Sequence, residues 1–173
     1  MRLTTALGAI LTGVVLLQPL AAAADTFEQG LSAYRSYDYA SAFTIWRELA
    51  RRGDAYSQSS LGFLYRNGLG APQDHAEAAR WFEAAAVQGV PEAQFYLGTM
   101  YLEGHGVSVA PDKAHFWCEL ALNQSLGAAL DCRERAMQQM TAEEVLDSWR
   151  RVSRWQASPA APAAAVKRDA PGI

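Results

Sequence analysis

The chain has 173 residues, of which 50% are hydrophobic and 19% are charged, and its formal net charge is −3. This composition is typical of one globular unit and excludes a disordered or fibrous chain. The slight acidic excess, with no lysine- and arginine-rich cluster, argues against a nucleic-acid interface.

The first 24 residues have the organisation of a secretory signal peptide. Arg2 supplies a positive start, and Ala22 to Ala24 form an A-x-A cleavage site. A retained membrane anchor is the alternative, but the apolar stretch of about 15 residues is shorter than the roughly 20 that span a bilayer. We therefore expect cleavage after Ala24 and a periplasmic or secreted protein without membrane association.

Residues 27–54 carry the pattern of a short helix pair. A first helix is expected to about Tyr37 and a turn from Asp38. The second helix places small and aromatic residues on one face: Ala42, Trp46 and Ala50. This segment lacks the Gly-x-Gly sequence that marks the units after it.

Two longer units follow, and their sequences repeat at a spacing of 36 residues. The stretch LGFLYRNGLG at 61–70 is matched by LGTMYLEGHG at 97–106. Such a fixed period is typical of stacked helical units. We take Ala93-Gln94 to be offset by one residue from Ser57-Gln58. The match extends into the second helix of each unit, where Ala78, Trp81, Phe82 and Ala85 align with Ala114, Trp117, Cys118 and Ala121.

The repeated glycines have two expected roles. Gly62 and Gly98 fall inside the first helices, where glycine costs roughly 1 kcal/mol relative to alanine. Their recurrence predicts that another helix approaches closely there. The Gly-x-Gly segments at 68–70 and 104–106 are expected to end these helices, because glycine readily adopts positive φ.

The second helices have recognisable starting residues. Asp74 and Glu77 have the spacing of a capping box, and Asp112 follows Pro111 before an alanine-rich stretch. We expect the two helices to begin at these positions.

Residues 61–89 and 97–125 resemble the Sel1-like repeat, a relative of the tetratricopeptide repeat, and residues 30–50 resemble the leading unit of exported bacterial members. The resemblance implies an all-α fold, a right-handed α-solenoid of antiparallel helix pairs, whose usual role is to hold a protein partner. It covers 25–155, with units at about 25–54, 55–90, 91–126 and 127–155. Three residues depart from the preceding unit: Ser125 replaces Gly89, Ala110 replaces Asp74, and Cys118 replaces Phe82.

The last unit is expected to be atypical, because terminal repeats cap a stack. A helix to about Met140 is followed by Thr141 and Glu144 at capping-box spacing, and then by a final helix. Residues 156–173 are rich in alanine and proline, which predicts a disordered spacer.

Cys118 and Cys132 are the two cysteines of the chain, and they lie at equal distances from the expected turn at Ser125. Antiparallel helices joined at this turn would bring them to one level, at the Cα separation of about 5.5–6 Å that a disulfide spans. An even cysteine count in an exported protein favours a disulfide, with two buried free thiols as the alternative. The bridge would close a loop of about 15 residues and add about 3 kcal/mol.

The sequence contains no catalytic or metal-binding pattern. His75, His105 and His115 do not have zinc-site spacing and are expected to be exposed. Neither a nucleophile elbow nor Ser-x-x-Lys occurs, and no Lys-Ser/Thr follows the Gly-x-Gly segments. We therefore expect a protein that is not an enzyme and that uses no cofactor or metal.

A candidate partner-binding stripe runs along the first helices, away from their Leu-Gly-Tyr face. By resemblance to tetratricopeptide stacks, the stripe lines the concave surface, and its mixed character fits an interface with a polar rim. The alternative is that Phe63 and Phe95 pack on adjacent repeats. Its members are Tyr56, Ser59, Phe63, Arg66 and Asn67 in one unit and Glu92, Phe95, Thr99, Leu102 and Glu103 in the next.

These patterns favour an exported scaffold or adaptor that binds a protein or peptide partner through its concave surface. Two alternatives remain. One is a structural or regulatory subunit of a cell-envelope assembly, stable only within it. The other is a binder or hydrolase of cell-wall-derived ligands.

Overall fold

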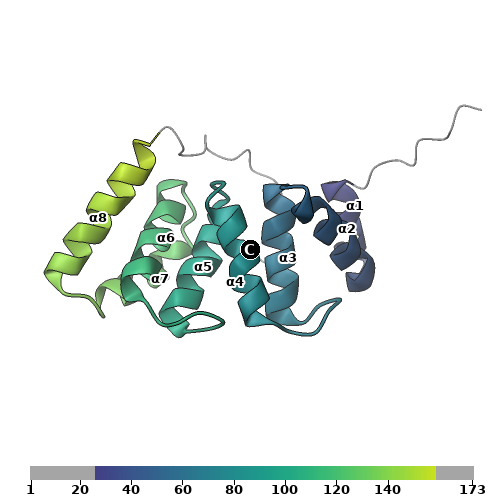
Figure 1. The fold of residues 1–173 in the computed structure, drawn as a ribbon, viewed down its shortest axis with the longest axis horizontal. Coiled ribbons are helices and arrows are strands. Elements are labelled where there is room, and N and C mark those ends of the chain that lie inside the picture. Colours follow the sequence, from purple (N-terminus) through teal and green to yellow (C-terminus); the bar gives the residue numbers. More distant parts are fainter. Residues whose placement is uncertain (1–25, 159–173) are drawn as a thin grey trace, which may run out of the picture.

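The computed structural model describes residues 26–158, and this part of the chain is entirely helical. Its helices follow one another along the long axis of the molecule (Figure 1). The expected signal peptide lies outside the described residues, as does the tail from residue 159. The helices are α1 (Phe27–Arg35), α2 (Tyr39–Arg51), α3 (Ala55–Asn67), α4 (His75–Ala86), α5 (Pro91–Glu103), α6 (Pro111–Asn123), α7 (Ala129–Met137) and α8 (Ala142–Gln156).

Side-chain caps start most of these helices, as the sequence indicates. The carboxylate of Asp74 accepts hydrogen bonds from the backbone N–H groups of Ala76 and Glu77. Glu77 does not return a bond to form the expected capping box; it pairs with Arg80 at 2.6 Å instead. The capping box of Thr141 is present. Ala110 provides no side-chain cap, and Pro111 at the first position of α6 needs no N–H partner.

Small residues in the first helix of each unit allow the second helix to approach closely. A Cβ atom on Gly62 would lie 2.9 Å from the Phe82 ring, and one on Gly98 would overlap the sulfur of Cys118. Gly30 lies in the same way against Trp46, whose side chain is fully buried. The expected close approach is therefore confirmed, and the side chains that face the three glycines, Trp46, Phe82 and Cys118, are fully buried.

The two glycines of each Gly-x-Gly segment have different roles. Gly68 and Gly104 end α3 and α5 in the left-handed conformation, as expected. Gly70 and Gly106 also have positive φ, and a Cβ atom on either would overlap the carbonyl oxygen of a residue in the preceding unit. Those carbonyls belong to Tyr39 and His75, the first residues of α2 and α4. The second glycine therefore forms a contact between units.

Two buried glutamines also join the units. The side-chain amide of Gln58 donates to the carbonyl of Ala50 at 3.1 Å, and that of Gln94 donates to Ala86 at 3.1 Å. Gln88 then donates to the Gln58 side chain, as Gln124 does to Gln94. The expected one-residue offset is wrong, because Gln58 and Gln94 are equivalent residues 36 positions apart. Each satisfies a carbonyl near the end of the preceding helix, where intrahelical donors run out.

The final helix departs from the pattern of the other units. Helix α7 ends at Met137, three residues before the expected end at Met140, and it packs against α5 and α6. Helix α8 packs against α6 rather than pairing with α7. The last two helices therefore do not form an antiparallel pair, and each packs on α6 by itself.

The predicted disulfide is present between Cys118 of α6 and Cys132 of α7, with a Cα separation of 6.2 Å. Both sulfur-bearing residues are buried and form a small cluster with Ala121 and Ala129. The side chain of Phe95 packs against this cluster. Ser125, in the turn between the two helices, adopts the positive φ that Gly89 has in the preceding unit.

No helix among residues 26–158 combines the length and the apolar content that crossing a membrane requires.

Candidate functional site

The central part of the predicted stripe forms a cluster that spans three units. Phe63 of α3 is half-buried, with its ring 6.2 Å from Tyr34 of α1 and 6.0 Å from Tyr96 of α5. The guanidinium of Arg66, one turn after Phe63, lies 5.0 Å above the Tyr96 ring. We call Tyr34, Phe63, Arg66 and Tyr96 the Phe63 cluster. It presents an arginine and an aromatic surface together on the first helices.

The electrostatics of the Phe63 cluster keep its tyrosines neutral. Burial raises the pKa of Tyr96 above its ordinary value, the nearby Arg66 cation opposes this, and the charge of Glu92 adds to the rise. The Arg66 guanidinium makes a cation–π contact with the face of the Tyr96 ring. Such a contact contributes about 0.5–1 kcal/mol at exposed sites. One carboxylate oxygen of Glu92 is shielded from water and accepts no hydrogen bond from the described residues.

Several of the remaining stripe residues are buried or bonded within their own helices. Tyr56, Ser59 and Leu102 are buried. The side chains of Asn67 and Thr99 donate to backbone carbonyls of their own helices. The expected stripe is therefore not one continuous surface.

Phe95 packs between the disulfide cluster and the Tyr96 ring, whose centroid is 5.3 Å from its own. Glu103 lies 3.3 Å from His105 and 3.8 Å from Arg135. Phe63 contacts both adjacent units, as the packing alternative predicts, while remaining partly exposed. Partner binding by any of these residues stays a prediction.

Sequence reasoning missed Tyr34 and Tyr96. Tyr96 follows Phe95 directly, and its equivalent in the previous unit is Ser60. Tyr34 lies in the first unit, which has no Gly-x-Gly segment to fix its register. The signal that could have found them is the aromatic content of three successive first helices.

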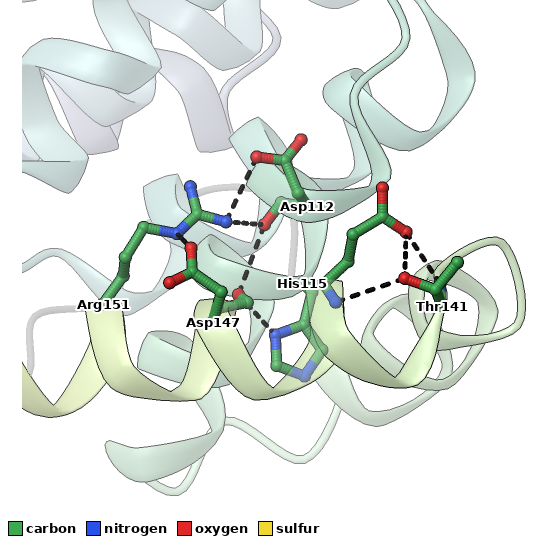
Figure 2. A network of polar contacts seen from close by, with 7 residues as sticks. Asp112, His115, Thr141, Asp147 and Arg151 are labelled. Atoms are coloured by element: carbon green, nitrogen blue, oxygen red, sulfur yellow. Dashed lines mark hydrogen bonds and ion pairs between the residues drawn. The ribbon is translucent and has the colours of Figure 1, made fainter.

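A second polar cluster lies where α8 crosses α6 (Figure 2). The Nδ1 atom of His115 is 2.8 Å from the hydroxyl of Ser148, which also donates to the Asp112 carbonyl at 3.4 Å. Arg151 bonds the Asp112 carboxylate at 3.1 Å and lies 3.5 Å from that of Asp147. The expectation that His115 is exposed is wrong: its exposed fraction is 0%, because α8 covers this face of α6.

The His115–Ser148 pair does not have the arrangement of a catalytic dyad. Ser148 is fully buried, so its hydroxyl cannot reach a substrate. The histidine uses Nδ1 for this contact, and its Nε2 atom has no hydrogen-bond partner among the described residues. A triad needs one ring nitrogen on the nucleophile and the other on a carboxylate. Within residues 26–158, no three metal-binding side chains converge.

The pKa of His115 is lowered to about 4, chiefly by burial and further by the positive charges of Arg133 and Arg151. Arg133 comes from α7 and lies 3.7 Å from Glu119, which is also buried on α6. Burial raises the pKa of Glu119, and Arg133 opposes the rise. The packing of α8 on α6 therefore requires a neutral histidine.

We expect acid to weaken the fold through His115. Unfolded histidine titrates near pH 6.5, so between pH 6.5 and about 4 the unfolded chain binds a proton that the folded chain excludes. The free energy of unfolding should fall by about 3 kcal/mol as pH decreases through this window. Because the pKa of Glu119 is raised in the folded chain, its protonation on acidification stabilises the fold and partly opposes this loss.

Denaturant unfolding at pH 7, 5.5 and 4 measures the effect in the parent, His115→Gln and His105→Gln. Glutamine retains a polar group beside Ser148 without titrating in this range. His115→Gln should lose most of the acid sensitivity, whereas His105→Gln, at an exposed loop position, should keep it. Equal acid sensitivity in all three proteins would contradict the assignment.

Comparison with known proteins identifies the repeats. The Sel1 repeat model matches residues 55–90 and 91–126. An exopolysaccharide production negative regulator of Rhizobium leguminosarum bv. viciae is 35% identical over 98 residues, which cover 49% of this chain and 35% of the regulator. The chain thus spans about a third of that relative's length.

Two crystal structures share the fold. A protective antigen of uropathogenic Escherichia coli strains, described as displaying an SLR fold, has a TM-score of 0.68 and 24% identity, over 83% of this chain and 34% of the antigen. A Sel1 repeat protein from Oxalobacter formigenes has a TM-score of 0.62 and 27% identity, over 75% of this chain and 55% of that protein. The expected all-helical solenoid is confirmed, and residues 55–126 are two Sel1 repeats, which supports a Sel1-like repeat protein.

Proposed function

We propose that this protein is an exported scaffold that binds a peptide segment of a protein partner on its first-helix face, at the Phe63 cluster. Sel1-repeat proteins are typically protein-interaction scaffolds. The observation that carries the proposal is the position of Arg66 over the Tyr96 ring, beside a partly exposed Phe63. Arginine and tyrosine are the residues most enriched among binding hot spots.

Export is supported by the disulfide between Cys118 and Cys132. Disulfides persist in oxidising compartments such as the bacterial periplasm and the extracellular space. This agrees with the signal-peptide pattern of residues 1–24.

A second candidate function is that of a regulatory or structural subunit of an envelope assembly. The observation in its favour is the exposure of large apolar side chains on the last two helices: Leu130, Leu146 and Trp149. A stack that ends in solvent is expected to have a polar outer face. The relative from Rhizobium is, by its name, a regulator.

The test of the first proposal is affinity capture from envelope extract with three forms of the protein. Arg66→Ala should reduce the recovery of a specific partner at least about tenfold, as loss of a binding hot spot does. Arg80→Ala is the matched control, because Arg80 is exposed on α4, a second helix, and pairs only with Glu77 among the described residues. Denaturant unfolding of each variant should show that all three forms fold equally well.

A partner lost with Arg66→Ala and kept with Arg80→Ala supports the first-helix face. Equal recovery by all three forms would exclude the Phe63 cluster as the binding site. A partner lost only when Leu146 and Trp149 are replaced by serine would favour the assembly subunit.

A further inference from the structure

An open pocket of about 370 Å³ lies at the C-terminal end of α8, where this helix packs on α6. It is lined by Phe116, Arg151, Arg154, Trp155 and Ser158. Phe116 comes from α6, and the other lining residues come from α8 and the two residues after it, so the pocket is separate from the Phe63 cluster. Its volume is at the small end of the range for ligand pockets.

The apolar wall of the pocket is fixed by aromatic packing. The Trp155 ring lies 6.1 Å from Phe116 at an interplanar angle of 89°, and 6.1 Å from Trp117. Phe116 and Trp117 are themselves in edge-to-face contact at 5.0 Å. Because Trp117 is buried in the core, it holds the partly exposed Phe116 and Trp155 in place. The pocket therefore offers a preformed aromatic surface of the size of one large side chain.

The polar part of the pocket is cationic. Arg151 forms ion pairs with Asp112 and Asp147. Arg154 is exposed, and no described carboxylate forms an ion pair with it. An aromatic wall beside an available guanidinium fits a group that is apolar and negatively charged. Arginine binds a carboxylate with two parallel hydrogen bonds, which selects this anion over a neutral amide.

We propose that this pocket binds an aromatic or branched apolar group that carries a carboxylate, with Phe116 and Trp155 contacting the apolar part and Arg154 the carboxylate. Such a group is supplied by the C-terminal residue of a peptide or by a free amino-acid derivative. This site is independent of the proposed scaffold function, because none of its residues belongs to the Phe63 cluster.

Arg154 also lies in the last turn of α8, where a cation offsets the negative end of the helix dipole. That role alone predicts a small loss of stability in an Arg154 variant and no change in ligand binding. Arg150, one turn earlier on the same helix, is exposed and does not line the pocket. It provides the matched control.

The test is an NMR titration of the full chain, labelled with ¹⁵N, with N-acetyl-L-phenylalanine and with N-acetyl-L-phenylalaninamide. We expect saturable shifts of the Trp155 indole N–H, and binding of the acid about tenfold tighter than that of the amide. Arg154→Gln should abolish this preference, and Arg150→Gln should retain it. Both variants are to be compared with the parent by denaturant unfolding.

Equal binding of acid and amide, equal effects of the two arginine variants, or the absence of saturable shifts would each overturn the proposal. The peptide Ala-Ala-Ala-Ala-Phe, with a free C-terminus, distinguishes the two sources. Tighter binding of the peptide than of N-acetyl-L-phenylalanine supports the end of a peptide as the natural ligand. Equal affinity supports a small organic acid.

Discussion

Replacement of Gly106 by alanine is expected to lower the free energy of unfolding by about 3 kcal/mol. The residue has φ of 73°, a conformation that costs an L-residue roughly 1–2 kcal/mol. The added Cβ would also overlap the carbonyl oxygen of His75, which belongs to the backbone of the preceding unit and cannot rotate away. The units would have to separate, at a further cost of about 1–3 kcal/mol.

Variants at two other glycines distinguish the cost of positive φ from the cost of the overlap with the His75 carbonyl. Gly53 also has positive φ, but a Cβ atom there would meet nothing within 4 Å, so Gly53→Ala measures the conformational cost alone. Gly127 has neither constraint, and Gly127→Ala should be neutral or stabilising. Denaturant unfolding of the three variants should rank Gly106→Ala as the most destabilised. A loss no larger than that of Gly53→Ala would contradict a role for Gly106 between units.

Loss of the disulfide is expected to lower the free energy of unfolding by about 3 kcal/mol, since Cys118 and Cys132 are 14 positions apart and their bridge constrains the unfolded chain over that loop. The effect should be greatest locally. The cluster that attaches α7 around the bridge is small, so α7 should open before the rest of the stack once the bridge is reduced.

Denaturant unfolding with and without reductant measures the global effect, and amide hydrogen exchange measures the opening of α7. The double variant Cys118→Ala, Cys132→Ala is the control, because reductant should not change its stability. Identical unfolding midpoints for the oxidised and reduced parent would contradict the estimate.

The sequence predicts the helices and their stacking because the determinants are local and repeated. Each helix pair carries its own Leu-Gly-Tyr pattern and its own helix-starting residues. The 36-residue spacing shows that the next pair repeats them. The disulfide is predictable for the same reason, since a short turn fixes the levels of Cys118 and Cys132. Features that one helix or one short turn determines can thus be read from the chain.

Features that depend on contacts between units are not predictable in this way. The role of Gly106 requires knowing that its loop touches the start of α4. The burial of His115 depends on α8 lying against α6, and the regular repeat would have placed α8 against α7. Phe95 is equivalent to Ser59 by sequence, but its ring packs against Tyr96 and against the disulfide cluster between α6 and α7.

The Phe63 cluster was predictable only in part. Phe63 and Arg66 are one turn apart on one helix, so helical spacing places them together. Tyr34 and Tyr96 join them from neighbouring units, at angles that sequence spacing does not define.

The most direct test of the scaffold function is photocrosslinking in living cells, with a benzophenone amino acid placed at one of two exposed positions. Asn67 is on the first-helix face beside the Phe63 cluster, and Arg80 is on the second helix α4. We predict one crosslinked partner from Asn67 that is not obtained from Arg80 and that disappears when Arg66 is replaced by alanine. The same products from both positions, or a partner captured from Arg80 alone, would contradict binding on the first-helix face.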